Sequence, residues 1–261
     1  MQSALEAFLV SGVLAFMLTF VRIGTAIIIM PGLGDSFVPT RIRLHMALGI
    51  SFVLFPLILP YIPNPIPSTF ELVGLIAMEL VIGLMIGTFA RIFMTALDTA
   101  GMVISSQSGL ANAQVFNPSL AAQGSIIGAF LSMTGAVILF ATNMHHLLIM
   151  GVMESYQMFP LGSVPDSGSM AELITKAVAA SFILGVKLAI PFVVITLLIY
   201  VGMGVLTRLM PQVQVFLVVL PLQILMAIVL LSLVAAALFH QWLTEFESAM
   251  FFFFSNGASP I

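Results

Sequence analysis

The sequence has no cysteine and very few charged residues, and each shortage excludes a class of protein. Without cysteine the chain can form neither disulfides nor thiolate metal sites, and it has no cysteine nucleophile. Charged residues make up only 7% of the chain, whereas they make up about 25% of a typical soluble domain. The net charge of −3 provides no basic surface for nucleic acid, so no nucleic-acid partner is expected. These shortages argue against a soluble enzyme and against a nucleic-acid-binding protein.

The stretches without Asp, Glu, Lys or Arg are long enough to cross a membrane. They comprise residues 44–70, 99–153, 188–207 and 209–244. A helix needs about 20 mostly apolar residues to cross the hydrocarbon core of a bilayer, and the longest stretch must turn within itself. With 61% apolar residues and a mean hydropathy of +1.22, the chain has too little polar surface for a water-soluble globule. We therefore predict an all-α fold, a membrane-type helical bundle.

Proline, glycine and polar residues divide the chain into six predicted helical segments. The segments lie near residues 4–30, 41–60, 70–102, 121–152, 170–200 and 213–242. Arg41 and Arg43 lie in the first connection and Arg208 in the fifth, so the positive-inside rule places both termini outward. No positive region precedes the first apolar segment, so we expect it to be retained as a helix.

Five ionisable residues fall within or near apolar segments, where each is costly in lipid. They are Arg22, Glu79, Arg91, Asp98 and Lys187. Arg22 and Arg91 are close enough to segment ends to reach the interface. Lys187 lies well inside its segment, and we expect it to form a buried structural ion pair with Glu79, a proton relay being the alternative.

No catalytic, cofactor-binding or metal-binding residues are predicted. His145 and His146 are adjacent, so on a helix they point about 100° apart and do not share a face. The sequence has no nucleophile elbow, P-loop or dinucleotide-binding fingerprint. We therefore expect that the protein is not an enzyme and that it binds no cofactor.

Glycines and prolines indicate how the helices pack. The pairs Gly83/Gly87 and Gly124/Gly128 place small residues on one helix face, which lets backbones approach closely. Pro191 and Pro221 each lie 15 residues from Leu206, at the apparent turn of the last hairpin. We predict that they kink facing helices at a similar depth, so that the hairpin can wrap around something, although the spacing can also be coincidence.

The segment 105–119 is rich in Gln, Asn, Ser and Gly, yet it has no charge and separates two apolar helices. It is either an ordinary exposed loop or non-helical backbone at membrane depth, which is tolerated only inside protein or along a cavity. The absence of charge favours the second interpretation, because an aqueous loop has no reason to avoid Lys and Glu.

Four sets of residues resemble a known family across the whole chain. They are Val38-Pro39-x-Arg41-x-Arg43, then Ala100-Gly101 with Gln107-x-Gly109-Leu110 and Phe116-x-Pro118, then Asn143-x-His145, and finally Leu206-x-Arg208-x-x-Pro211-Gln212-x-x-x-Phe216 with Pro221 beyond. Together they resemble the FliR family, the flagellar type III protein export gate subunit, which is related to SctT-type virulence components. Two positions depart from the family pattern: Asn117 precedes Pro118 where an acidic residue is frequent, and Met144 replaces a usual glycine.

The resemblance implies a division into two parts and a position for each. Residues 1–165 resemble a FliP subunit with a central plug loop near 105–119, and residues 166–261 resemble a FliQ hairpin followed by a tail. The implied pore plug comprises Gln107, Gly109, Leu110, Phe116, Asn117 and Pro118. The implied hairpin turn at the cytoplasmic entrance comprises Arg208, Pro211, Gln212 and Phe216.

The function that the resemblance implies is a non-enzymatic structural and gating subunit of the flagellar export channel. Its implied partners are FliP and FliQ, FlhB and FlhA, membrane lipid, and unfolded flagellar substrates in transit. The implied location is the flagellar basal body in the bacterial inner membrane, with the gate raised toward the periplasmic side. The alternative is a self-contained secondary transporter with helices broken around Gly109 and Pro191, but such a transporter should show two matching halves. An intramembrane enzyme ranks last, because the sequence shows no credible pair of a nucleophile and a base.

Overall fold

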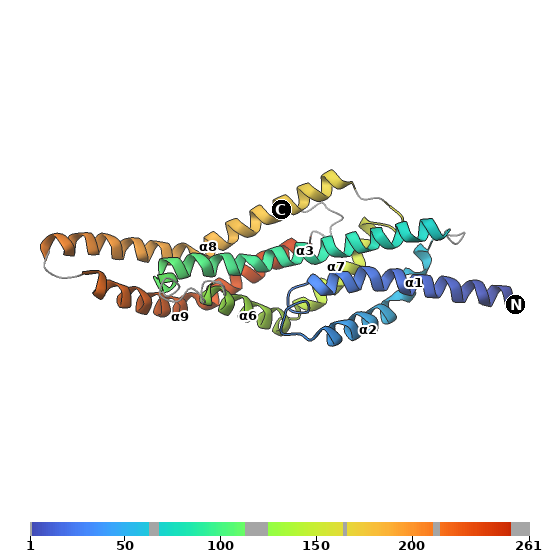
Figure 1. Ribbon diagram of the computed structural model, residues 1–261, viewed down its shortest axis with the longest axis horizontal. Coiled ribbons are helices and arrows are strands. Elements are labelled where there is room, and N and C mark those ends of the chain that lie inside the picture. Colours follow the sequence, from blue (N-terminus) through green and yellow to red (C-terminus); the bar gives the residue numbers. More distant parts are fainter. Residues whose placement is uncertain (1, 63–67, 113–124, 164–165, 211–214, 252–261) are drawn as a thin grey trace. The chain divides into compact units, whose positions relative to one another are not determined.

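The structure is a computed structural model that describes residues 2–62, 68–112, 125–163, 166–210 and 215–251 (Figure 1). Every element in these ranges is helical, as the sequence predicts. The α-helices are α1 (Gln2–Ile29), α2 (Thr40–Ile58), α3 (Thr69–Gln107), α6 (Ile126–Ala141), α7 (Met144–Met158), α8 (Ser167–Leu209) and α9 (Val215–Met250). Two short 3₁₀ turns, η1 (Leu59–Tyr61) and η2 (Leu110–Asn112), follow α2 and α3.

Among the described residues, five helices are long and apolar enough to cross a membrane, and the bent pair α6 and α7 makes a sixth if counted as one span. The predicted membrane-type helical bundle is thus confirmed. Three helices are longer than a span requires: α3 has 39 residues, α8 has 43 and α9 has 36. At about 1.5 Å per residue, α8 is roughly 65 Å long, about twice the thickness of the hydrocarbon core.

The fourth predicted segment is wrong as one continuous helix. It breaks between α6 and α7, which are bent by 77° relative to each other. Asn143 forms the break in the left-handed conformation, with φ 62° and ψ 16°. Neither glycine nor proline marks this position, so the sequence pattern did not reveal it; asparagine is one of the few residues that adopt this conformation readily.

Substitutions at Asn143 should follow the cost of this backbone conformation. Asn143→Gly should leave thermal stability unchanged within a degree or two, whereas Asn143→Val should destabilise the protein by about 1–2 kcal/mol, because a β-branched side chain opposes positive φ. The measurement is the melting temperature of the detergent-extracted protein. Equal stability of the two variants would show that the break does not depend on the left-handed residue.

Local sequence explains where two of the long helices begin. At α3 the Ser68 amide and hydroxyl both donate to the Glu71 carboxylate, at 2.7 and 2.9 Å, which is a capping box. At α8 the Asp166 carboxylate accepts from the hydroxyl and the amide of Ser169, at 2.7 and 2.9 Å. These bonds, with one from the Gly168 amide, hold the pKa of Asp166 below its usual value.

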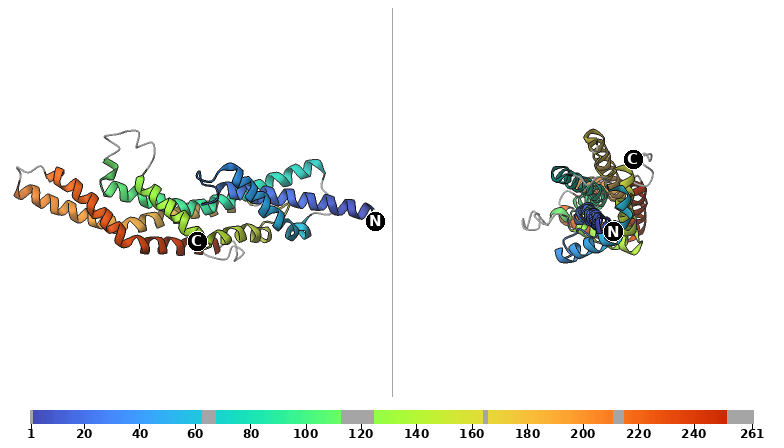
Figure 2. Two further views of the ribbon diagram at one scale, coloured as in Figure 1. Left: turned by 90° about the horizontal axis from the view of Figure 1, so that it is seen from below. Right: turned by 90° about the vertical axis from the view of Figure 1, so that its right-hand side faces the viewer.

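The helices fold into two compact units. The first contains residues 1–92, 139–177 and 247–261, and the second contains residues 93–138 and 178–246. In the first unit α1 and α2 lie side by side (Figure 1). In the second unit the C-terminal part of α8 lies beside the N-terminal part of α9 (Figure 2). The division at residue 165 that the family resemblance implies remains a prediction.

The second unit has a tightly packed interior around the single tryptophan of the chain. Trp242 on α9 is fully buried, and its indole N–H donates to the Phe93 carbonyl of α3 at 3.1 Å. Gly101 on α3 lies directly against Gly128 on α6, with no room for a side chain on Gly101. The Ser125 hydroxyl donates to the Gly101 carbonyl at 2.9 Å beside this crossing. This contact accounts for Gly101 and Gly128, whereas Gly83 and Gly87 of α3 lie against Arg22, Thr25 and Ala26 of α1.

Candidate functional site

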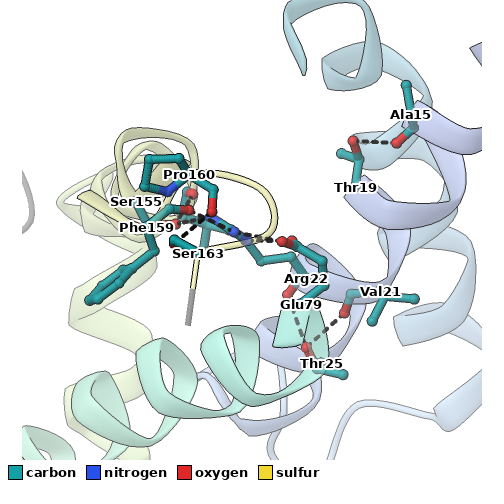
Figure 3. A network of polar contacts seen from close by, with 11 residues as sticks. Ala15, Thr19, Val21, Arg22, Thr25, Glu79, Ser155, Phe159, Pro160 and Ser163 are labelled. Carbon is teal, nitrogen blue, oxygen red and sulfur yellow. Dashed lines mark hydrogen bonds and ion pairs between the residues drawn. The ribbon is translucent and has the colours of Figure 1, made fainter. Parts of the chain in front are cut away.

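A buried polar network joins three helices of the first unit (Figure 3). The Arg22 guanidinium on α1 donates from Nε to Glu79 Oε2 at 2.6 Å and from a terminal nitrogen to Glu79 Oε1 at 2.8 Å. The side chains of Arg22 and Glu79 are 0% and 1% exposed. This geometry is the bidentate pairing that guanidinium and carboxylate groups prefer. The pair therefore fastens α1 to α3 in an interior without solvent.

Residues of α7 and its C-terminal end complete the network. Arg22 also donates to the Ser155 hydroxyl at 3.1 Å and to the Phe159 carbonyl at 3.0 Å. The Tyr156 ring lies under the guanidinium, with its centroid 3.6 Å from Arg22 Cζ, in a cation–π contact. A fully buried arginine needs such a set of partners, because an uncompensated charge would be strongly destabilising in this interior.

This network corrects two sequence predictions. Glu79 pairs with Arg22 and not with Lys187, because both of its carboxylate oxygens accept from the same guanidinium. Lys187 is exposed on α8 and forms no ion pair with any residue that the structure describes. Arg22 was expected to extend toward the membrane interface, but it is fully buried. Spacing along one chain could not show which acid and which base approach each other.

A second ion pair binds the connection between α1 and α2 to α3. Arg91 on α3 pairs with the Asp35 carboxylate, which also accepts from the Gly32 amide at 2.7 Å. The Arg91 side chain remains 42% exposed, as expected for a residue near a segment end. The sequence indicates that Arg91 is an ionisable residue within an apolar segment, but it does not indicate the partner. Asp98, the remaining ionisable residue of α3, accepts from the Ser132 hydroxyl of α6.

The structure describes only the beginning of the predicted pore plug. Gln107 is the last residue of α3, so the helix includes positions 105–107, which were predicted to be loop. Gly109 has φ 75°, a conformation that favours glycine, and Leu110 begins η2. Phe116, Asn117 and Pro118 lie outside the described residues. The plug assignment therefore stays a prediction.

The predicted hairpin turn and helix kinks are also described in part. Arg208 is an exposed residue in the last turn of α8, while Pro211 and Gln212 lie outside the described residues. Phe216 belongs to the first turn of α9. Pro191 and Pro221 lie inside α8 and α9, and both helices continue through them. Their role as kinks remains a prediction.

Large apolar side chains are exposed on helices of both units. On α2, α8 and α9 the following are at least 60% exposed: Phe52, Val53, Leu57, Phe182, Leu197, Leu198, Val201, Leu209, Leu225 and Leu233. An open apolar groove of about 490 Å³ between α1 and α2 is lined by Gly12, Val13, Phe16, Phe52, Phe55, Pro56 and Leu59. Surfaces of this kind are stable only against lipid or protein. In the described part of the chain, no cluster of three or more His, Asp or Glu side chains could hold a metal ion.

Comparison with known proteins assigns the family. The model of the family described as "Bacterial export proteins, family 1" matches residues 13–249. The chain belongs to this family. The match covers every described α-helix at least in part.

Individual relatives of this bacterial export family support the assignment over most of the chain. The flagellar biosynthetic protein FliR of Caulobacter vibrioides is 39% identical over 234 residues, which is 89% of this chain and 93% of that protein. FliR of Bacillus subtilis is 29% identical over 86% of this chain and 87% of that protein. The Yop proteins translocation protein T of Yersinia pestis is 26% identical over 84% of both chains. The resemblance to FliR and to virulence export components is confirmed.

Proposed function

We propose that this protein is a non-enzymatic structural and gating subunit of the flagellar type III protein export channel. The observation that carries the proposal is the family match over residues 13–249, together with a flagellar relative 39% identical over 89% of the chain. In this role the chain assembles with FliP-type and FliQ-type subunits in the inner membrane at the flagellar basal body. FlhB and FlhA meet it at the cytoplasmic side, and unfolded flagellar proteins are the transported substrates.

Two properties of the described helices are compatible with an assembled subunit. Helices α3 and α8 are far longer than a bilayer requires, which suits a gate that extends beyond the membrane plane. Apolar side chains exposed on α2, α8 and α9 can be covered by neighbouring subunits as well as by lipid.

In the proposed channel the segment 107–119 closes the pore. It has no charged residue, so it can occlude the channel without binding a passing polypeptide tightly. The hairpin end with Arg208, Pro211, Gln212 and Phe216 faces the cytoplasmic entrance. Pro191 and Pro221 bend the hairpin so that it follows the curvature of the assembly.

Deleting residues 107–119 should leave the complex assembled but make it leak. The deleted complex should keep the native mass of the parent, with one copy of this chain and several copies of two smaller membrane proteins. Reconstituted in liposomes, it should pass ions that the parent complex retains. A same-length Gly/Ser replacement of 107–119 is the matched variant, since it keeps the connection but removes the bulky side chains.

Two results would contradict the proposal at different levels. A deleted complex that assembles and stays impermeable would remove the plug role but keep the subunit role. A lone monomer or homodimer of the parent chain that binds a small solute would favour a secondary transporter and remove both roles.

A further inference from the structure

A small polar cavity lies inside the second unit, where α8, α9 and the residues after α3 meet. Its volume is about 10 Å³. It is lined by Ser108, Phe192, Ile195, Thr196, Ile199, Gln223, Met226, Ala227 and Leu230. Most of these residues are apolar, so three polar side chains at one small cavity call for a physical explanation.

Gln223 brings a hydrogen-bond donor to this cavity that no described protein atom satisfies. The side chain is 7% exposed, and its Nε2 atom is buried without a hydrogen-bond partner among the described residues. An unsatisfied buried donor is destabilising, because it has lost its hydrogen bonds to water and gained none in the protein. A glutamine in an otherwise apolar helix would therefore be destabilising here unless something accepts its hydrogen.

The two hydroxyl groups at the cavity can act only as acceptors toward it. The Thr196 hydroxyl donates its hydrogen to the Gln107 carbonyl at 3.1 Å, and the Ser108 hydroxyl donates to the Ser105 carbonyl at 3.1 Å. The Ser108 oxygen also accepts from the Leu110 amide at 3.5 Å. Since a hydroxyl has one hydrogen and two acceptor positions, each oxygen keeps at least one acceptor position. Thr196 and Ser108 are 5% and 2% exposed, so bulk water does not reach these lone pairs freely.

The residues that line this space of about 10 Å³ thus include one with an unpaired donor and two with hydroxyl acceptors. A cavity needs about 10–15 Å³ of this measure to hold a water, and buried waters typically make about three hydrogen bonds. We propose that Gln223, Thr196 and Ser108 bind a single internal water, which accepts from Gln223 Nε2 and donates to the two hydroxyl oxygens. Gln223 Nε2, which has no protein partner among the described residues, then donates one of its two hydrogens to the water.

This water site joins three segments that are distant in sequence. It connects α9 at Gln223 to α8 at Thr196 and to Ser108, the first residue after α3. Thr196 also holds the last carbonyl of α3 at Gln107. The site therefore links the end of α3 to the C-terminal hairpin through hydrogen bonds. Any role of this site in gating rests on the proposed function, because residue 107 begins the proposed plug. The existence of the water site does not rest on the proposed function.

The direction in which one substitution changes the melting temperature tests the site. Gln223→Met keeps the length and flexibility of the side chain but removes the donor. If the water is bound, the variant should lower the melting temperature of the purified native complex by roughly 2–4 °C. If Nε2 is unsatisfied instead, removing it should raise the melting temperature, and the proposal fails. Gln241→Met, at an exposed position of the same helix, is the matched control and should change little.

A double-mutant cycle with Thr196→Val tests whether the two residues share the water. The double variant Gln223→Met/Thr196→Val should be about as stable as the less stable single variant, because either change already removes the shared site. Additive effects would overturn the proposal. A cryo-electron microscopy map that resolves ordered water should show density within hydrogen-bond distance of all three side chains, and a direct Gln223–Thr196 bond there would also overturn it.

The same variants separate this proposal from the gating role. If the water site restrains the proposed plug, the Gln223→Met complex in liposomes should leak more ions than the Gln241→Met complex. Non-additive stability and water density without leakage would confirm the water site and reject only its part in gating.

Discussion

Replacing Glu79 with glutamine should destabilise the protein by about 3–5 kcal/mol, because it leaves the Arg22 charge buried without a counterion. The Arg22 side chain is fully buried, and its remaining contacts with Ser155, Phe159 and Tyr156 involve neutral groups. We expect the full-length chain to fall to a small fraction of its normal amount in membranes. Any extracted protein should melt at a much lower temperature.

The control for this prediction is the same substitution in an exposed ion pair. Glu172→Gln disrupts the pair with Lys176, whose side chains are 67% and 58% exposed. Exposed pairs contribute about 0–1 kcal/mol, so this variant should resemble the parent protein. The double variant Arg22→Met/Glu79→Leu should recover much of the loss, because it removes both charges. If Glu79→Gln behaves like Glu172→Gln, the buried network does not stabilise the fold.

Replacing Gly101 with alanine should be strongly destabilising, because there is no space for the added methyl group. A Cβ atom at Gly101 would overlap the Gly128 backbone of α6 and lie 2.9 Å from the Ile127 carbonyl carbon. Backbone atoms cannot rotate away as a side chain can, so the two helices must separate. We expect a loss of about 3 kcal/mol or more, seen as poor accumulation in membranes and a lower melting temperature.

Gly74→Ala on the same helix provides the opposite expectation. No atom lies within 4 Å of a Cβ built at Gly74, so the substitution adds helix propensity without a clash. It should be neutral or stabilise the protein by up to about 1 kcal/mol. Comparing the stability of Gly101→Ala with that of Gly74→Ala separates the effect of packing from the effect of helix propensity, because both variants make the same substitution on α3. Equal effects would show that the close α3–α6 contact is absent in the protein.

The positions of most helices could be predicted because hydropathy and breaking residues are local signals. Proline and capping residues mark the starts of α2, α3 and α8, and each predicted start lies within three residues of the observed one. The ends were less accurate: α3, α8 and α9 continue for several residues past the predicted ends, because little in the sequence opposes helix there. The Asn143 break was missed since its only marker is a residue that tolerates positive φ.

The candidate site was less predictable, since it depends on which side chains meet across helices. Arg22, Glu79 and Lys187 were all identified as costly ionisable groups, yet the acid was assigned to the wrong base. The contributions of Ser155 and Tyr156 left no signal in the sequence. Gln223 could have been noticed as an uncharged polar residue inside an apolar helix, although only the fold shows that Ser108 and Thr196 lie at the same cavity.

The sequence by itself determined that this protein is a membrane-type helical bundle of the bacterial export family. Composition, charge-free runs and family motifs are properties of the chain that need no tertiary contact to be read. Only the tertiary structure decided that Glu79 neutralises Arg22, that Gly101 meets Gly128, and that Gln223 shares a cavity with two hydroxyls. The physical reason is that pairing energies depend on distance and burial, and both are set when helices far apart in sequence pack together.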